Sequence, residues 1–143
     1  MSILKFTDAD IPETEEIEKL CFSVPWSGQA LGMLTQEPYS AFVLREDGKL
    51  AAYGGMLCVA GEAQILNIAT APQFRRRGYA HQLIGVLCEK AKECGAVSVS
   101  LEVRESNLSA RSLYLSEGFS VIGIRKNYYV KPQEAAIIME KKL

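Results

Sequence analysis

The 143-residue chain has little with which to bind a metal ion. It contains one histidine, His81, and its four cysteines form no C-x-x-C pair. Because zinc sites are built mainly from histidines and closely spaced cysteines, we expect no metal site. We predict instead that the thiols are reduced and mainly buried. They belong to Cys21, Cys58, Cys88 and Cys94.

The sequence also lacks long apolar runs and an excess of either charge. No apolar run approaches the roughly 18 residues that span a bilayer, and the N-terminus, MSILKFTDAD, does not resemble a signal peptide. Sixteen Lys and Arg residues against seventeen Asp and Glu residues give a formal net charge of −1. No strong positive field would attract nucleic acid or an anionic membrane. We therefore expect a cytoplasmic protein that binds neither directly.

What is present is typical of one globular domain. A hydrophobic content of 48% is enough to bury a core, and no linker, repeat or low-complexity segment interrupts the chain. We predict a single domain over residues 1–143, acting as a monomer or a weak homodimer.

Hydrophobic periodicity predicts an α/β chain. Asp10 with Glu13 resembles a capping box before the first helix, Asp47-Gly48 indicates a tight turn between antiparallel strands, and Gly95 is placed to end a helix. The predicted strands are 2–7, 39–46, 49–60, 62–70, 96–103, 119–129 and 135–143, and helices are predicted after Asp10, Ser27, Gly78 and Asn107.

Strict alternation marks residues 96–103, AVSVSLEV. In a strand, Glu102 would share one face with two serines and point away from an aliphatic row. That row consists of Val97, Val99, Leu101 and Val103.

Residues 73–83, QFRRRGYAHQL, place three arginines and Gly78 before a helical pattern. A helix N-terminus offers unpaired N–H groups and about half a positive charge, and glycine lets the backbone approach a ligand closely. The segment therefore predicts a phosphate-binding loop that uses backbone amides.

The spacing in this loop is recognisable. Residues 68–80, IATAPQFRRRGYA, resemble the acetyl-CoA-binding signature of the GNAT superfamily of N-acetyltransferases, which Arg75, Gly78 and Ala80 match. Further segments resemble, in order and spacing, the bacterial ribosomal-protein-alanine N-acetyltransferases of that superfamily. They are FSVPWS (22–27), LNIAT (66–70), SLEVRESNLSARSLYLSEGF (100–119) and RKNYY (125–129).

The resemblance implies the GNAT fold, a mixed and mostly antiparallel sheet of six to seven strands, splayed at the acetyl-CoA site, with about four helices. It implies acetyl-CoA as co-substrate and no metal. The cofactor-binding residues that it implies are Ile68, Ala69, Thr70, Arg76, Arg77, Gly78, Tyr79, Ala80, His81 and Asn107.

The resemblance also implies the chemistry, direct acetyl transfer with Glu102 as general base and Tyr114 as general acid. The acceptor would be the N-terminal amine, of alanine, in a ribosomal protein. An α-amine with a pKa near 7.8 costs only about 1 kcal/mol to deprotonate at pH 7, against about 4.6 for lysine. Trp26, Tyr128 and Tyr129 would form the walls of a peptide groove.

Other interpretations stay open on sequence grounds. The acceptor could be a small-molecule amine or a lysine side chain, or the arginines could serve a non-catalytic RNA-binding or ribosome-binding module. Glu102 could be an exposed strand carboxylate and Tyr114 a core aromatic, and Trp26, Tyr128 and Tyr129 could equally be core aromatics. His81 and Ala80 also stand where many relatives have a basic residue and glycine, which predicts modest acetyl-CoA affinity.

Overall fold

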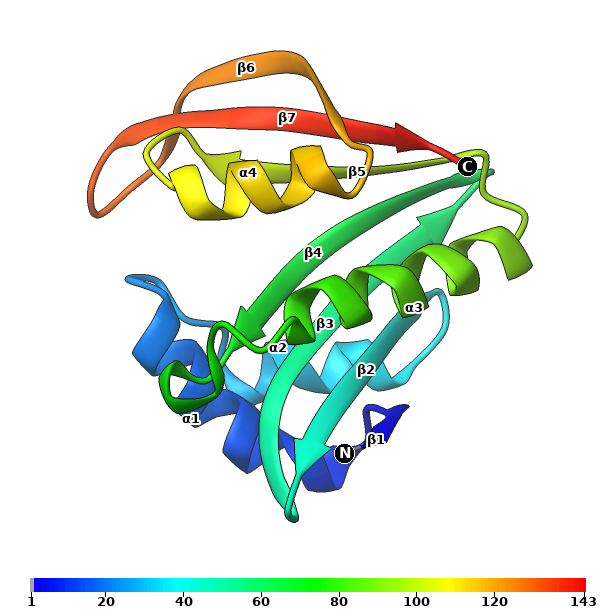
Figure 1. Ribbon diagram of the computed structural model, residues 1–143, viewed down its shortest axis with the longest axis vertical. Helices are drawn as coiled ribbons and strands as arrows, with labels where there is room; N and C mark the ends of the chain where they lie inside the picture. The colour runs from blue at the N-terminus through cyan, green and yellow to red at the C-terminus, as the bar shows by residue number, and fades with distance from the viewer. Residues whose placement is uncertain (1) are drawn as a thin grey trace.

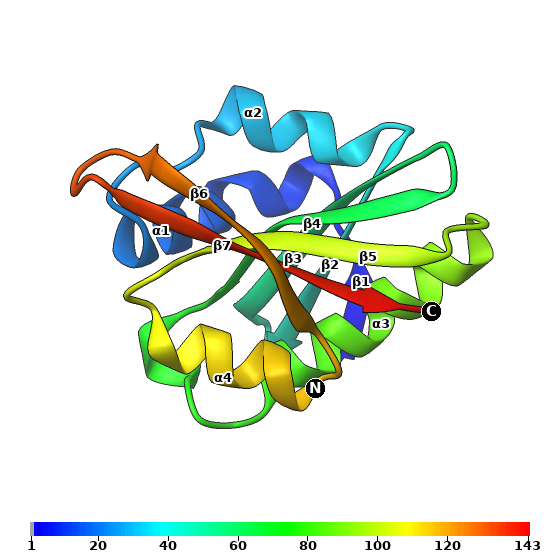
Figure 2. The same ribbon diagram turned by 90° about the horizontal axis from the view of Figure 1, so that it is seen from above.

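The computed structural model describes residues 2–143, which form one seven-stranded sheet with helices on both faces (Figures 1 and 2). The strand order is β1-β2-β3-β4-β5-β7-β6, and every neighbouring pair is antiparallel except β4 and β5. The predicted mixed, mostly antiparallel sheet is therefore confirmed. The strands are β1 (Ser2–Lys5), β2 (Tyr39–Glu46), β3 (Lys49–Val59), β4 (Glu62–Thr70), β5 (Ser98–Arg104), β6 (Ser120–Tyr129) and β7 (Glu134–Lys142).

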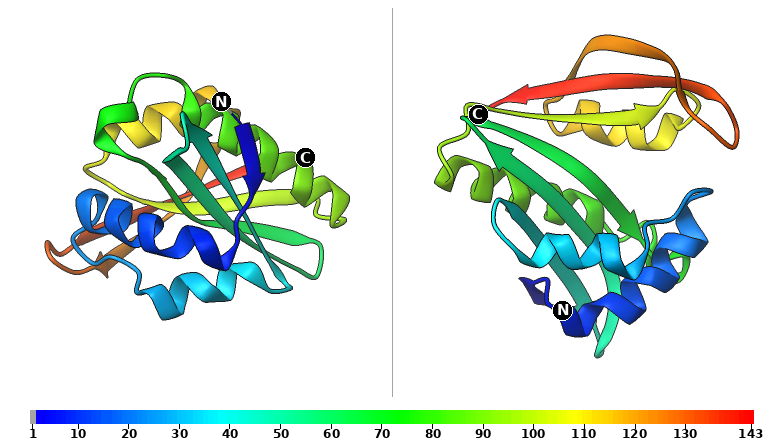
Figure 3. Two further views of the ribbon diagram at one scale, coloured as in Figure 1. Left: turned by 90° about the horizontal axis from the view of Figure 1, so that it is seen from below. Right: turned by 180° about the vertical axis from the view of Figure 1, so that it is seen from behind.

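The helices divide between the two faces of the sheet. Figure 2 shows α1 and α2 on one side and α3 and α4 on the other, and Figure 3 shows the same arrangement from below and behind. None of the helices in the described part of the chain is long and apolar enough to cross a membrane. Their bounds are α1 (Ile11–Cys21), α2 (Gly28–Gly32), α3 (Tyr79–Glu93) and α4 (Leu108–Ser116).

The predicted capping box of Asp10 with Glu13 is wrong. A short 3-10 turn precedes α1, and the Asp10 carboxylate accepts a hydrogen bond from the backbone N–H of Thr7 at 2.8 Å. Glu13 instead accepts from Arg45 on β2 at 2.8 Å and from the backbone N–H of Leu50. Glu13 therefore accepts from distant donors and not from the backbone N–H of Asp10, the donor that a capping box would use. The turn places Glu13 at the edge of the β2–β3 hairpin, where these distant donors lie.

Two expectations about burial are met only in part. All four cysteines are free, but only Cys88 is buried, Cys21 and Cys58 are half-buried and Cys94 is exposed. Val97 is 69% exposed, because β5 begins one residue later, at Ser98. The remaining alternation of β5 is as predicted, with Val99, Leu101 and Val103 buried.

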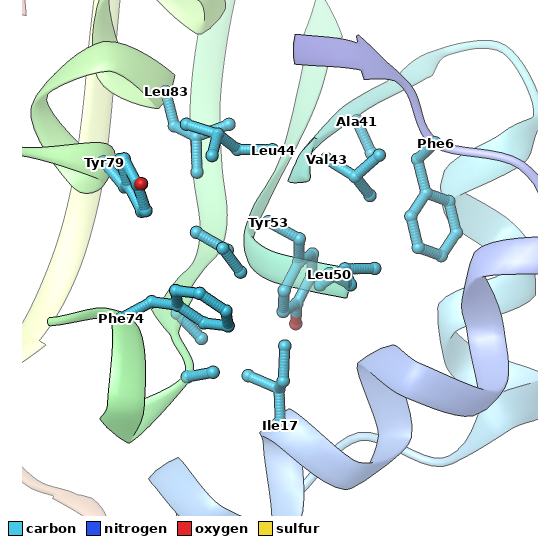
Figure 4. Close-up of a cluster of buried hydrophobic side chains, with 14 of the residues drawn as sticks. Phe6, Ile17, Ala41, Val43, Leu44, Leu50, Tyr53, Phe74, Tyr79 and Leu83 are labelled. Carbon is cyan, nitrogen blue, oxygen red and sulfur yellow. The ribbon is translucent and has the colours of Figure 1, made fainter. Parts of the chain in front are cut away.

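The core consists of two clusters, and the first includes residues of both α1 and α3. The cluster drawn in Figure 4 packs Phe6, Ile17 and Tyr53 between the sheet and α1. The other places Ile84 and Leu87 of α3 against β3, β4 and β5. Close packing of α3 requires glycine on β3, since a Cβ at position 54 would lie 3.0 Å from a methyl carbon of Leu87.

The sheet opens between β4 and β5, which diverge in Figure 1. They pair only at Glu62–Gln64 with Ser98–Ser100, although β4 continues to Thr70 and β5 to Arg104. On its other edge β4 keeps its pairing with β3, interrupted by a bulge at Leu66. From residue 65 onward, β4 therefore presents a backbone edge that has no strand partner on the β5 side.

Candidate active site

Two cavities lie where β4 and β5 separate, with volumes of about 640 and 620 Å³. We call the first the loop cavity, because it extends to residues 74–81, and the second the Glu102 cavity, because it contains that carboxylate. The two share part of their lining, so they meet. The shared residues are Cys21, Phe22, Ile68, Asn107, Ala110 and Tyr114.

The N-terminus of α3 forms one wall of the loop cavity. Gly78 has φ +78° and a Cβ there would have nothing within 4 Å, so the position faces open space. No side chain caps this helix end, and the first intrahelical bond runs from the Gln82 N–H to the Gly78 carbonyl. The N–H groups of the first turn are consequently available to a ligand, and the helix dipole favours an anionic one.

Almost all of the residues predicted to bind the cofactor line the loop cavity. Arg77 is the exception, because its guanidinium pairs with Glu46 at 2.6 Å and stacks over the ring of Phe74. The predicted residues that line this cavity are Ile68, Ala69, Thr70, Arg76, Gly78, Tyr79, Ala80, His81 and Asn107.

Two further side chains of the loop, Arg75 and His81, also contact protein groups. Arg75 donates to the Thr70 carbonyl and to the sulfur of Cys21, each at 3.4 Å. The His81 ring contacts the carboxylate of Glu117 at the end of α4. The backbone of the loop, more than its side-chain charge, is thus free to bind an anion.

Glu102 lies in the other cavity with one oxygen buried and unpartnered. Its side chain is 16% exposed, its Oε1 is 4.0 Å from the Arg125 guanidinium, and its Oε2 has no hydrogen-bond partner. Burial, with the charge and the close approach of the Glu102 carboxylate as further causes, raises the pKa of Tyr128 above its ordinary value, although the two side chains do not meet in hydrogen-bond geometry. A buried carboxylate oxygen without a donor is suited to accept a proton or N–H from a substrate.

Tyr114 lies at the junction of the cavities. It comes from α4, whose N-cap Asn107 accepts from the Ala110 N–H at 3.2 Å as its position predicted. The Tyr114 ring packs on the Phe119 ring, with centroids 5.8 Å apart. Burial raises the pKa of Tyr114 to about 12, so the phenol keeps its proton across the physiological range.

Aromatic side chains wall the Glu102 cavity, as predicted for a peptide groove. Trp26 approaches from the segment after α1, while Tyr128 and Tyr129 come from the end of β6. The two tyrosine rings meet edge to face with centroids 5.1 Å apart. Rigid aromatic walls of this kind suit an extended peptide.

Sequence reasoning assigned no role to Arg104, which joins both sides of this groove. Its guanidinium donates to the carbonyls of Val130 and Pro132, at 2.9 and 2.8 Å, and to the Ser23 hydroxyl at 3.3 Å. It also lies over the Tyr129 ring, 4.5 Å from the centroid. Arg104 therefore ties the β6–β7 connection to the segment after α1, and only its position two residues after Glu102 hinted at this.

The described residues hold no group of three or more His, Cys, Asp and Glu side chains that could bind a metal ion.

Comparison with known proteins gives this arrangement a family. Residues 11–119 match the acetyltransferase (GNAT) family. The ribosomal protein bS18-alanine N-acetyltransferase of Escherichia coli is 36% identical over 140 residues, covering 96% of this chain and 95% of that protein. The Haemophilus influenzae enzyme of the same name is 39% identical over 143 residues, covering 97% of each chain.

Solved structures agree with the sequence comparison. The crystal structure of the ribosomal-protein-S18-alanine N-acetyltransferase from Escherichia coli has a TM-score of 0.91 and 35% identity, covering 99% of this chain and 92% of that one. The chain therefore belongs to the acetyltransferase (GNAT) family and is an acetyl-CoA-dependent acyltransferase.

Proposed function

We propose that this enzyme acetylates the N-terminal amine, of alanine, in a ribosomal protein equivalent to bS18. The observation that carries the proposal is the meeting of the two cavities at Tyr114, with Glu102 in the second. A donor thioester held in one cavity and an amine held in the other would come together at that junction. The relatives that act on bS18 match nearly the full chain, which supports the same acceptor here.

The loop cavity fits acetyl-CoA, which supplies the acetyl thioester. The uncapped first turn of α3 offers N–H groups to a pyrophosphate, and Gly78 leaves the backbone uncovered. The free edge of β4 offers backbone groups at Ile68 and Thr70 to the amides of a pantetheine arm. Ala69 between them directs its backbone groups toward β3, as Ala71 does when its N–H donates to the Ala51 carbonyl, and it lines the cavity with its remaining atoms.

Glu102 is the proposed base. Its unpartnered Oε2 can accept an N–H of the incoming amine, directly or through a water molecule. An α-amine releases its proton more readily than lysine by about 2.6 pKa units, or about 3.5 kcal/mol, so one carboxylate suffices for an N-terminus. The single base in the groove therefore favours an N-terminal acceptor.

Tyr114 is the proposed acid, and its raised pKa refines that role. Because burial raises its pKa to about 12, the phenol still carries its proton when the sulfur departs. Tyr114 Oη can therefore donate a hydrogen bond to the departing sulfur, along which a proton can pass.

The acceptor class is the first prediction. We expect transfer to the α-amine of a peptide carrying the N-terminal sequence of bS18, and little transfer to an N-terminally blocked peptide with lysine or to a small polyamine. Mass spectrometry locates the acetyl group. The reverse preference would overturn the proposal in favour of a small-molecule or lysine acceptor, and salt-sensitive RNA binding without turnover would favour a non-catalytic module.

The second prediction concerns the amide cradle. Gly78→Val should weaken acetyl-CoA binding at least roughly tenfold, because a branched side chain covers the N–H groups. Gly95→Val is the matched control: Gly95 also has a positive φ, +83°, and open space around its Cβ, but lies at the far end of α3. Calorimetric titration should show unchanged acetyl-CoA affinity in Gly95→Val. It should also show a smaller loss of acetyl-CoA affinity in Arg76→Ala than in Gly78→Val. A larger loss at Arg76 would mean that side-chain charge dominates.

The third prediction tests the base. Glu102→Gln should lower kcat by roughly 10² to 10⁴ and alter the acidic limb of the pH profile, while acetyl-CoA binding stays nearly intact. Glu105→Gln, an exposed carboxylate that lines neither cavity, is the control. Near-normal turnover of Glu102→Gln with an unchanged acidic limb would show that the amine loses its proton by another route.

The fourth prediction concerns Tyr114 and pH. Since burial raises its pKa to about 12, the phenol stays protonated up to pH 10, where an ordinary tyrosine is half ionised. Tyr114→Phe should therefore reduce kcat by roughly 10- to 100-fold at every pH from 6 to 10, without moving either limb. Tyr39→Phe, which removes a hydroxyl outside both cavities, should not. A basic limb below pH 10 that disappears in Tyr114→Phe would contradict this ionisation state.

A further inference from the structure

A second unpartnered acceptor lines the Glu102 cavity. Among residues 2–143, the buried side-chain oxygens without a hydrogen-bond partner are Glu102 Oε2 and Asn67 Oδ1. Both residues line this cavity, and Asn67 is only 8% exposed. Buried acceptors are nearly always satisfied in native proteins, so two orphans in one cavity point to a ligand that brings N–H donors.

The orientation of the Asn67 amide is fixed by its neighbours. Its Nδ2 donates to Glu18 Oε2 at 3.2 Å and to the Tyr53 hydroxyl at 3.0 Å, which uses both amide hydrogens. The Tyr53 hydroxyl in turn donates to Glu18 Oε2 at 2.5 Å. Turning the amide over would place Oδ1 against two oxygens that have no hydrogen to offer. The carbonyl oxygen is therefore held on the side of the amide opposite Glu18 and the Tyr53 hydroxyl.

Burial and the Glu18 charge together keep this arrangement in place. They raise the pKa of Tyr53 far above its ordinary value, so its hydroxyl remains a donor. Glu18 is fully buried on α1, and its other oxygen accepts from the Trp26 N–H at 2.8 Å. One carboxylate thus positions both the Asn67 amide and the backbone of a groove-wall residue.

The bulge in β4 explains why Asn67 faces this carboxylate. Ile65, before the bulge, packs in the cluster that contains Ile84 and Leu87 of α3, whereas Asn67, after it, donates to Glu18 of α1. Residues 65 and 67 would share one face of a regular strand. The extra residue, Leu66, shifts the alternation and turns Asn67 toward α1 and Glu18.

We propose that Asn67 Oδ1 accepts one N–H of the acceptor amine while Glu102 takes the other, an inference that rests on the proposed N-terminal acetylation. A neutral primary amine has two N–H bonds and one lone pair. With each N–H bonded to one of the two orphan oxygens, the orientation of the lone pair is set. Asn67 thereby directs the lone pair toward the thioester at the Tyr114 junction, and Glu18 is a positioning residue that acts through Asn67.

The test measures peptide turnover and cofactor binding separately. Asn67→Ala should lower kcat/KM for the alanine peptide by roughly 10- to 100-fold, with acetyl-CoA affinity changed less than about twofold. Glu18→Gln should show a similar loss although Glu18 lines neither cavity, because a glutamine amide lets Asn67 turn over. Asn67→Ser, whose hydroxyl can still donate to Glu18 but which has no carbonyl, repeats the test if Asn67→Ala does not fold.

Ile17→Val is the control, because it disturbs the same core cluster without lining either cavity. It should lower thermal stability and leave peptide kcat/KM unchanged. If the wild-type enzyme acetylates the peptide and the Asn67 variants retain kcat/KM within about threefold of the wild-type value, the role of Asn67 is overturned while the proposed function stands. An equal loss in Ile17→Val would also overturn it, since the effect would then be one of stability. A wild-type protein inactive on the peptide would overturn the proposed function, and this role with it.

Discussion

Everything at the site depends on the early end of pairing between β4 and β5. The two strands share only three register positions, and beyond Gln64 the parallel ladder stops although both strands continue. A backbone edge without partners is costly when it is buried, so it needs water or a ligand. Here the separation creates both cavities at once, and Glu102 of β5 and Asn67 of β4 line the same one. A regular ladder would have closed this space with hydrogen bonds.

The opening is stabilised from outside rather than across the gap. On the β4 side, close packing of α3 on Gly54 and of α1 on the other face fixes the position of the strand. On the β5 side, β7 pairs along the whole of β5, from Ser98 to Arg104. Arg104 then spans the mouth by holding both loops that border it. Each strand is thus supported by its own neighbours, and the space between them can admit two substrates.

Local sequence patterns made several elements of the fold and the site predictable. The alternation of β5 located Glu102 on the half-buried face, Asp47-Gly48 gave the β2–β3 turn, and Gly78 before an amphipathic stripe gave the start of α3. These are properties of short segments, where period and turn chemistry decide the structure. The GNAT family and its sheet followed from resemblance over nearly the whole chain.

What sequence reasoning missed depends on contacts between distant residues. Glu18, Tyr53 and Asn67 come from α1, β3 and β4, and nothing in their local patterns indicates that they meet. Cys21 and Phe22 lie where α1 ends, a position that a helical pattern does not place beside β4. Glu13 was misread for the same reason, since its partner Arg45 is 32 residues away. Such groups are found only once the fold brings them together.

The three arginines show how little a charge cluster reveals by itself. Arg77 pairs with Glu46, and Arg75 donates to the Thr70 carbonyl and the Cys21 sulfur, so both arginines attach the loop to neighbouring elements. Arg76 has φ +65° and, together with Gly78, gives the loop the left-handed turns that expose the start of α3. In an enzyme with net charge −1, the proposed anion binding at this loop would therefore depend first on backbone direction, with Arg76, which also lines the loop cavity, adding side-chain charge. Because backbone dipoles are fixed by the fold while arginine heads are mobile and screened by salt, such a cradle is ordered before its ligand arrives.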